Sequence, residues 1–330
     1  MNDGVEKFSG GDSPQHTPAA RLRGVLLPFT TPFGVGGEVD AAALGANIER
    51  WNEAGVAGYV ALGSTGERAH LDERERMEVV ETARGCVGSG LAFIVGVGEQ
   101  STRGTIAEAR RAAGAGADAL LVLTPHFYRA AMSQEALAEH FAAVAEASNV
   151  PVVLYNIPQN TGVAIAPETV ARLSEHSNIC GIKDSSGDLS NLSEMLRLAG
   201  GCRDDFAVLT GHAGVFYASL CAGACGAILA AGCVVPRLCV RIFEAFRAGD
   251  HAYALDLQQR LAPLARAVTT RYGIGGLKAA LDLAGYGGGA VRAPLRAPGA
   301  EARAEIARLL EEAEGAPDAP GVDIKIQGGI

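Results

Sequence analysis

Two stretches, Pro151-Val-Val-Leu-Tyr155-Asn-Ile-Pro158 and Asn178-Ile-Cys-Gly-Ile-Lys183-Asp-Ser185-Ser-Gly187, carry the main information on the fold of this chain. Each is a short apolar run that ends in one polar, reactive side chain. Runs of this length and β-branched content are typical of strands buried on both faces, as in a parallel sheet. The pattern therefore predicts that Tyr155 and Lys183 lie at the ends of two buried strands.

Similar apolar runs recur along the chain and alternate with segments of helical periodicity. Strands alternating with helices predict a parallel sheet, and eight such repeats predict a (β/α)8 TIM barrel. The alternative is an open doubly wound sheet, which normally has fewer strands and a phosphate-binding turn after the first. The expected strands are 24–29, 56–62, 91–97, 118–124, 151–156, 178–183, 206–211 and 225–230, and the helices between them are 41–54, 72–84, 102–115, 133–148, 167–176, 189–199 and 213–222.

The chain divides into four expected segments. Residues 1–20 are polar and rich in Gly, Ser and Pro, so we expect a flexible N-terminal arm. The catalytic barrel is expected over 21–232. The strand pattern then stops, and helices at 234–247, 251–269, 276–283 and 300–314 predict a C-terminal helical subdomain over 233–314, followed by a tail at 315–330.

The composition excludes several classes of protein. Hydrophobic residues make up 48% of the 330 residues, which is enough for a large core. The net charge is −9 and no basic patch stands out, so nucleic acid and anionic membranes are not expected partners. No run reaches membrane-spanning length and no signal core is present, which favours the cytoplasm.

The seven cysteines are expected to be reduced thiols rather than disulfides or metal ligands. Their number is odd and most lie in apolar surroundings, as in a cytosolic protein. Cys221 and Cys225 are four residues apart, but no second pair or histidine cluster completes a zinc site. We therefore expect no metal.

In a barrel, the active site forms at the C-terminal ends of the strands, where Lys183 and Tyr155 are expected. A buried lysine favours the neutral amine, which can form a Schiff base with a ketone, and a nearby phenol can move the protons required. The alternative interpretation is a lysine that only ends a strand and extends to solvent.

The loop Gly63-Ser64-Thr65-Gly66-Glu67 follows the second expected strand. Its two hydroxyls and backbone N–H groups could bind a carboxylate, although an ordinary glycine turn would have the same sequence. His126 and His212 are expected at the barrel mouth as polar rim groups rather than essential bases. Phosphate-loop, dinucleotide, nucleophile-elbow and zinc-protease motifs do not occur.

Four motifs together resemble those of the dihydrodipicolinate synthase/N-acetylneuraminate lyase family of class I aldolases. They are Gly63-Ser-Thr-Gly-Glu67, Tyr155-Asn-Ile-Pro158, Gly181-Ile-Lys183-Asp and Gly223-Ala-Cys-Gly226-Ala-Ile228, within a match over residues 24–298. The resemblance implies a (β/α)8 barrel with a C-terminal helical subdomain, and a homo-oligomer, either dimer or tetramer. It also implies two small-molecule partners, a 2-oxo acid (pyruvate) and an aldehyde, and no metal or organic cofactor.

The same resemblance implies roles for individual residues. Lys183 forms the Schiff base, Tyr155 relays protons, and Ser64 hydrogen-bonds Tyr155. The remaining candidates bind substrate: the N–H groups of Ser64 and Thr65 hold the C1 carboxylate, the Ile228 carbonyl positions the imine, Gly211 lines the site, and Asn160 and Ser185 contact the distal part.

Within the family, the chain most resembles the 4-hydroxy-2-oxoglutarate aldolases, which cleave their substrate to pyruvate and glyoxylate. The segments Tyr128-Arg-Ala-Ala-Met132, Asn160-Thr-Gly162, Arg271-Tyr-Gly-Ile-Gly-Gly-Leu-Lys278 and Arg292-Ala-Pro294-Leu carry this finer resemblance. The alternatives are 4-hydroxy-tetrahydrodipicolinate synthase, a 2-keto-3-deoxy sugar acid aldolase or dehydratase, and a catalytically silent barrel that only binds an oxo acid.

Two positions depart from the family pattern. The synthases usually carry an arginine for the carboxylate of the aldehyde substrate at the position of Asn160, which weakens the synthase interpretation. The family also tends to place a proton-relaying tyrosine, which often enters the neighbouring subunit's site, at the position of Phe127. Tyr128 is its neighbour and a candidate substitute.

Overall fold

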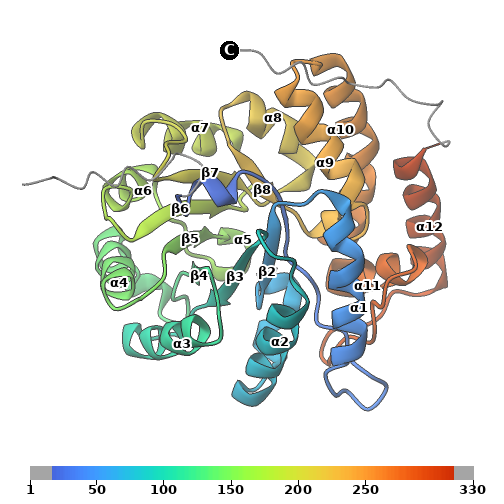
Figure 1. Ribbon diagram of the computed structural model, residues 1–330, viewed down its shortest axis with the longest axis horizontal. Coiled ribbons are helices and arrows are strands. Elements are labelled where there is room, and N and C mark those ends of the chain that lie inside the picture. Colours follow the sequence, from blue (N-terminus) through green and yellow to red (C-terminus); the bar gives the residue numbers. More distant parts are fainter. Residues whose placement is uncertain (1–16, 316–330) are drawn as a thin grey trace, which may run out of the picture.

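The computed structural model describes residues 17–315. Eight parallel strands pair in chain order and close between the last strand and the first, which confirms the predicted (β/α)8 TIM barrel (Figure 1). The strands are β1 (Gly24–Leu27), β2 (Gly58–Ala61), β3 (Ala92–Val97), β4 (Ala119–Leu123), β5 (Val152–Asn156), β6 (Ile179–Asp184), β7 (Ala207–Thr210) and β8 (Gly226–Ile228).

Helices surround the strands, and several begin at the polar residues that cap them. The Asp72 side chain accepts a hydrogen bond from the Glu75 N–H in a capping box, and Ser133 caps the Ala136 N–H, so both predicted helix starts are confirmed. The helices up to β8 are α1 (Ala41–Trp51), α2 (Glu73–Cys86), α3 (Thr102–Gly114), α4 (Gln134–Glu146), α5 (Pro158–Thr161), α6 (Pro167–Leu173), α7 (Leu189–Leu198) and α8 (Phe216–Cys221).

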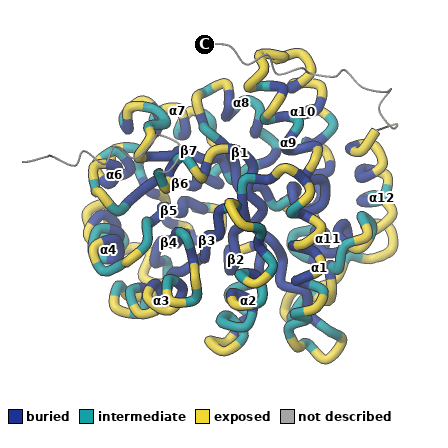
Figure 2. Tube along the Cα trace, viewed as in Figure 1, coloured by how far each residue is buried: buried dark blue, intermediate teal, exposed yellow. Residues whose placement is uncertain are grey.

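The hydrophobic core has two layers because every strand is buried on both faces (Figure 2). One layer fills the barrel interior and includes Leu26, Val60 and Leu121. The other lies between the strands and the surrounding helices and includes Trp51 and Phe141. The polar ends of the strands are thus the places where the barrel offers reactive side chains.

The base of the barrel is covered by the segment that precedes β1. Ala19 and Leu22 are buried in the interior cluster, around a 3-10 turn at Ala20–Leu22. Residues 17–20 were expected in a flexible arm, and this part of the prediction is wrong because the apolar side chains close the open end of the interior core. The rest of the predicted arm and the tail beyond Gly315 lie outside the described residues.

Four longer helices follow β8: α9 (Pro236–Arg247), α10 (His251–Arg266), α11 (Gly273–Leu283) and α12 (Ala300–Glu314). Helix α9 packs on β1 and α8, as the eighth helix of the ring, and it also packs extensively on α10, while α12 packs on both α10 and α11 (Figure 1). The boundary expected at 232/233 stays a prediction. None of the described helices combines the length and the hydropathy needed to cross a membrane.

Candidate active site

A cavity of about 820 Å3 lies at the C-terminal ends of the strands. It brings together side chains and backbone from six strand ends, those of β1, β2, β5, β6, β7 and β8. All eight residues that the sequence singled out line this cavity: Ser64, Thr65, Tyr155, Asn160, Lys183, Ser185, Gly211 and Ile228.

Lys183 and Tyr155 are neighbours at the centre of the cavity. They are register partners on β6 and β5, so both side chains leave the barrel at the same level. The Lys183 side chain is only 3% exposed, and its Nζ lies 4.4 Å from the centroid of the Tyr155 ring. Within residues 17–315, Lys183 forms no ion pair. The arrangement suits an amine that attacks a carbonyl group beside a proton donor.

The loop after β2 brings a second hydroxyl to Tyr155. The Ser64 Oγ and the Tyr155 hydroxyl oxygen lie 3.0 Å apart and form a hydrogen bond. In the described chain, the backbone N–H groups of Ser64 and Thr65 donate no hydrogen bond. Two such N–H groups at the start of a 3-10 turn, Ser64–Gly66, are the donors that a carboxylate requires.

This loop has a strained backbone that its surroundings hold in place. Leu62 and Glu67 both have φ of 54°, a left-handed conformation that costs side-chain-bearing residues on the order of 1–3 kcal/mol. The Thr31 hydroxyl donates to the Gly66 carbonyl at 2.7 Å. Such conformations persist only where other contacts fix them, and the Glu67 side chain makes contacts of this kind.

Glu67 ties the loop to the C-terminal helices through a buried ion pair. Its Oε1 lies 2.5 Å from the Nζ of Lys278 on α11, and its Oε2 accepts from the Arg292 N–H at 3.2 Å. Lys278 also donates to the Ala290 carbonyl at 2.6 Å. Burial lowers the pKa of Lys278, while the Glu67 carboxylate opposes this shift by favouring the ammonium form. The second buried lysine is therefore bound to a carboxylate, unlike Lys183.

Replacing Lys278 with methionine is expected to destabilise the protein by about 3–5 kcal/mol, because the Glu67 carboxylate would remain buried without its cation. Urea unfolding of the two proteins measures this difference. The double variant Glu67→Gln/Lys278→Met is the control, since it removes both charges and should recover much of the loss. Equal stability of the single and double variants would contradict the assignment of the cost to an unpaired carboxylate.

The space beside Lys183 is kept narrow by Gly211, which follows β7. A Cβ atom at Gly211 would lie 2.0 Å from the Ser185 Oγ and 2.9 Å from the Lys183 Cε. The Gly211 N–H donates to the Asp184 carbonyl at 2.6 Å, and the Ser185 N–H donates to the Asn156 carbonyl at 2.8 Å. The two strand ends therefore approach each other closely around the reactive amine.

The outer part of the cavity contains the expected residues Asn160 and His212 together with residues that no sequence motif indicated. Asn160 on α5 is exposed there, and the neighbouring Gln159 side chain donates to the Ser185 carbonyl at 2.8 Å. His212 lines the cavity with a buried Nδ1 that has no hydrogen-bond partner in the described part of the chain. The missed lining residues come from Gln159 and Ser186 and from the C-terminal helices, including Arg266, Thr269 and Thr270. No motif marked these positions.

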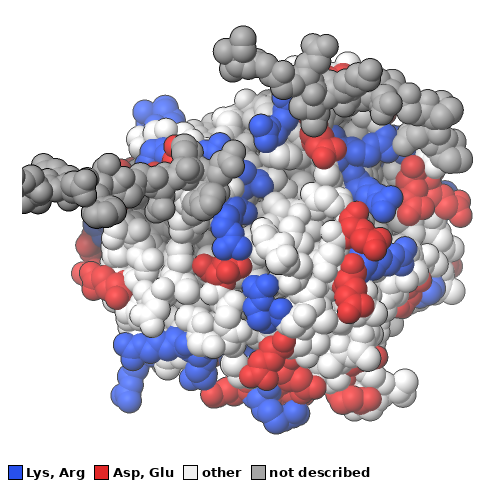
Figure 3. Space-filling view, in the orientation of Figure 1, with Lys and Arg blue, Asp and Glu red and all other residues white. Residues whose placement is uncertain are grey.

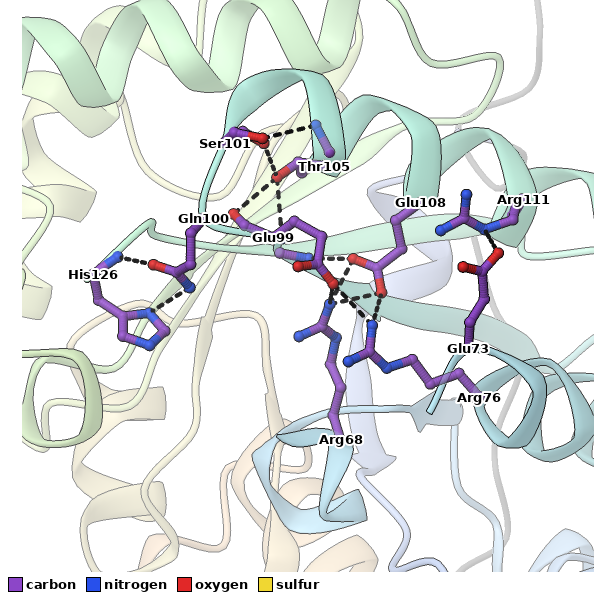
Figure 4. A network of polar contacts seen from close by, with 12 residues as sticks. Arg68, Glu73, Arg76, Glu99, Gln100, Ser101, Thr105, Glu108, Arg111 and His126 are labelled. Atoms are coloured by element: carbon purple, nitrogen blue, oxygen red, sulfur yellow. Dashed lines mark hydrogen bonds and ion pairs between the residues drawn. The ribbon is translucent and has the colours of Figure 1, made fainter. Parts of the chain in front are cut away.

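Phe127 and Tyr128 do not line the cavity. They are 72% and 69% exposed, and their rings stack edge to face with centroids 5.0 Å apart. Their loop is held by Gln100, whose Oε1 accepts from the N–H groups of His126 and Phe127. Figure 4 shows the contact with His126.

The segment that carries Gln100 is itself fixed by a cluster of ion pairs. Arg68 lies 2.6 Å from Glu108, and Arg76 lies 2.8 Å from Glu99, as Figure 4 shows. The Glu108 carboxylate also accepts from the Gly98 N–H at 2.9 Å. The cluster therefore joins the loop after β2, helix α2 and the loop after β3, and stabilises the exposed aromatic pair.

Comparison with known proteins identifies the family. The model of the dihydrodipicolinate synthetase family matches residues 21–313. The 4-hydroxy-tetrahydrodipicolinate synthase of Methanothrix thermoacetophila is 38% identical over 289 residues, which cover 88% of this chain and 96% of the relative. The synthase of Agrobacterium fabrum is 39% identical over 275 residues, which cover 83% and 92%. These relatives are synthases, so the finer resemblance to 4-hydroxy-2-oxoglutarate aldolases stays a prediction.

Solved structures give the same result. The dihydrodipicolinate synthase of Thermotoga maritima superposes with a TM-score of 0.85 at 30% identity, covering 89% of this chain and 99% of that one. A monomeric dihydrodipicolinate synthase variant also has a TM-score of 0.85 at 30% identity, with coverages of 90% and 98%. The chain therefore belongs to the dihydrodipicolinate synthetase family, and it is a class I aldolase, a carbon–carbon lyase.

Proposed function

We propose that the protein cleaves 4-hydroxy-2-oxoglutarate to pyruvate and glyoxylate through an imine on Lys183. The charge of the cavity carries this proposal. Its described lining contains Lys183, Arg266 and His212 but no Asp or Glu, in a chain of net charge −9. A lining of this kind suits a substrate with two carboxylates and no ammonium group.

The reaction would start with attack of the Lys183 amine on the C2 ketone. The carbinolamine then loses water, for which the Tyr155 hydroxyl supplies the proton, and a protonated imine remains. The N–H groups of Ser64 and Thr65 would bind the C1 carboxylate, and the Ile228 carbonyl would orient the imine. Asn160 and Ser185 are the neutral candidates for contact with the distal part.

The imine serves as the electron sink for cleavage. The C4 hydroxyl gives its proton to Tyr155 and becomes the aldehyde of glyoxylate, while the C3–C4 electron pair moves into the imine and forms an enamine. Protonation at C3 and hydrolysis of the imine then release pyruvate and restore Lys183. The hydrogen bond between Ser64 and Tyr155 links the phenol to a second hydroxyl for these proton transfers.

The names of the relatives favour a second candidate, 4-hydroxy-tetrahydrodipicolinate synthesis. That product has a ring nitrogen, so the aldehyde that reacts with pyruvate must carry an amine. The described lining offers an ammonium group neutral acceptors, such as Asn160 and Thr269, but no carboxylate. The amide of Asn160 also offers no charge to the carboxylate of that aldehyde.

A direct comparison of kcat/KM decides between the candidates. Pyruvate release would be measured with 4-hydroxy-2-oxoglutarate and with a 2-keto-3-deoxy sugar acid, and pyruvate consumption with aspartate semialdehyde. We expect the highest value for 4-hydroxy-2-oxoglutarate. A higher value for aspartate semialdehyde would overturn the proposal in favour of the synthase. Borohydride trapping of pyruvate without turnover of any of these compounds would favour the silent barrel.

We also propose that the protein forms a homo-oligomer through the aromatic pair Phe127 and Tyr128. Two large exposed rings on an anchored loop are unusual on a surface that contacts only water. Phe127→Ser/Tyr128→Ser is therefore expected to lower the molar mass in sedimentation equilibrium, with Leu255→Ser, an exposed apolar residue on α10, as the control. An unchanged molar mass of the double variant would contradict this role.

The cytoplasm is the proposed location. All seven cysteines are free thiols in the structure, as expected where thiols stay reduced. Cell fractionation followed by immunodetection tests this proposal, and recovery in a membrane or secreted fraction would contradict it.

A further inference from the structure

The proposed substrate has a second carboxylate that needs its own partner. The first carboxylate has the N–H groups of Ser64 and Thr65, and Lys183 is used by the imine. Asn160 and Ser185 are neutral, and hydrogen bonds from neutral donors are about half as strong as those from a charged donor. A volume of about 820 Å3 also leaves ample room beyond a three-carbon acid.

Among the described lining residues, Arg266 carries the only guanidinium group. It is exposed at the last position of α10. The structure gives it no hydrogen bond and no ion pair, counted over residues 17–315. Two other arginines that follow β8 are engaged: Arg271 pairs with Glu305, and Arg292 pairs with Glu75. An unpaired guanidinium beside an acid-free cavity is available for an anion.

The backbone around Arg266 is also irregular. The chain changes from α-helix to a π-helical turn at Ala267–Arg271, and such turns are rare and frequent at functional sites. Val268, Thr269 and Thr270 of this turn line the cavity together with Arg266. The turn therefore presents consecutive residues to the same cavity, which a regular helix face of 3.6 residues per turn would not do.

The charge around Arg266 contrasts with the outer surface. Figure 3 shows both basic and acidic side chains on the face in view. The cavity differs, because its described lining contains Lys183 and Arg266 but no carboxylate. The described lining of the cavity therefore suits an anion.

We infer that Arg266 binds the second carboxylate and is the residue that selects 2-oxo dicarboxylic acids over monocarboxylic ones. The inference rests on the proposed function, since it names the distal partner for the same substrate class. The Arg266 guanidinium can donate two parallel hydrogen bonds to one carboxylate and also carries a positive charge. Neither Asn160 nor Ser185 can provide such a charged, bidentate contact.

A matched pair of ligands tests this role without turnover. 2-Oxoglutarate and 2-oxopentanoate have the same length and the same ketone, and differ in a terminal carboxylate or methyl group. The measurement is the concentration of each that gives half-maximal borohydride trapping on Lys183, read by intact mass. We expect the wild-type protein to prefer 2-oxoglutarate, and Arg266→Gln to reduce that preference by about 10- to 100-fold. Arg266→Lys should restore part of it.

Arg271→Gln is the matched control, since it removes the same charge at the other end of the π-helical turn that follows Arg266, at a position outside the lining. It should leave the preference unchanged. An unchanged preference in Arg266→Gln, or no preference in the wild-type protein, would overturn the inference. In a third outcome, the wild-type protein prefers 2-oxoglutarate but does not cleave 4-hydroxy-2-oxoglutarate, and Arg266→Gln loses the preference. This outcome would overturn the proposed function and support the role of Arg266.

Discussion

Replacement of Lys183 by methionine is expected to abolish the covalent adduct with pyruvate and to lower kcat for cleavage by about 10⁵-fold or more. The amine is the only group at the centre of the cavity that can form an imine, and without it the C3–C4 bond has no electron sink. Methionine keeps an unbranched stem in the narrow space beside Gly211, so the fold should be preserved. Borohydride reduction with pyruvate, read by intact mass, measures the adduct.

Peptide mapping makes this experiment specific, because the chain has few lysines: Lys7, Lys183, Lys278 and Lys325. Lys278 is the internal comparison, since it is buried like Lys183 but paired with Glu67. We expect the label on Lys183 and none on Lys278. A label on another lysine, or an adduct that persists in Lys183→Met with an unchanged thermal midpoint, would contradict the proposed mechanism.

Removal of the Tyr155 hydroxyl by Tyr155→Phe is expected to lower kcat by 10²–10⁴-fold, the usual contribution of a positioned acid or base. The hydroxyl bonds to Ser64 and lies beside the Lys183 amine, where both the carbinolamine and the C–C step require proton transfer. The amine remains, so the pyruvate adduct should still form, but more slowly. Borohydride reduction of samples taken at successive times measures the rate of adduct formation, and a coupled assay measures turnover.

Tyr59→Phe is the control for loss of a buried phenol hydroxyl. The Tyr59 hydroxyl donates to the Asn52 Oδ1 at 2.9 Å, away from the cavity. Both variants should lose about 0.5–1.5 kcal/mol of stability, but only Tyr155→Phe should lose turnover. An unchanged kcat in Tyr155→Phe would exclude Tyr155 as the proton relay, and an equal loss in Tyr59→Phe would point to stability instead.

The barrel could be predicted from the sequence because its signals are local. Apolar runs such as Val152–Leu154 indicate strands buried on both faces, and capping residues such as Asp72 indicate where helices begin. The positions of Lys183 and Tyr155 also followed, because parallel strands place their C-terminal ends on one face of a barrel. Only the boundaries shifted, as at Ala19, whose burial depends on the interior core that it covers.

The tertiary structure alone decided which distant residues complete the site. Glu67 meets Lys278 across more than two hundred residues, and Arg266 reaches the cavity from a helix that has no motif. Such contacts depend on how α10 and α11 pack against the barrel, and no local pattern records that packing. The sequence by itself determined the barrel and the places of Lys183 and Tyr155, since these follow from periodicity and strand direction. The support of the loop Gly63–Glu67 and the charge of the outer cavity were determined by packing between elements, because electrostatic interactions depend on distance in space and not on separation along the chain.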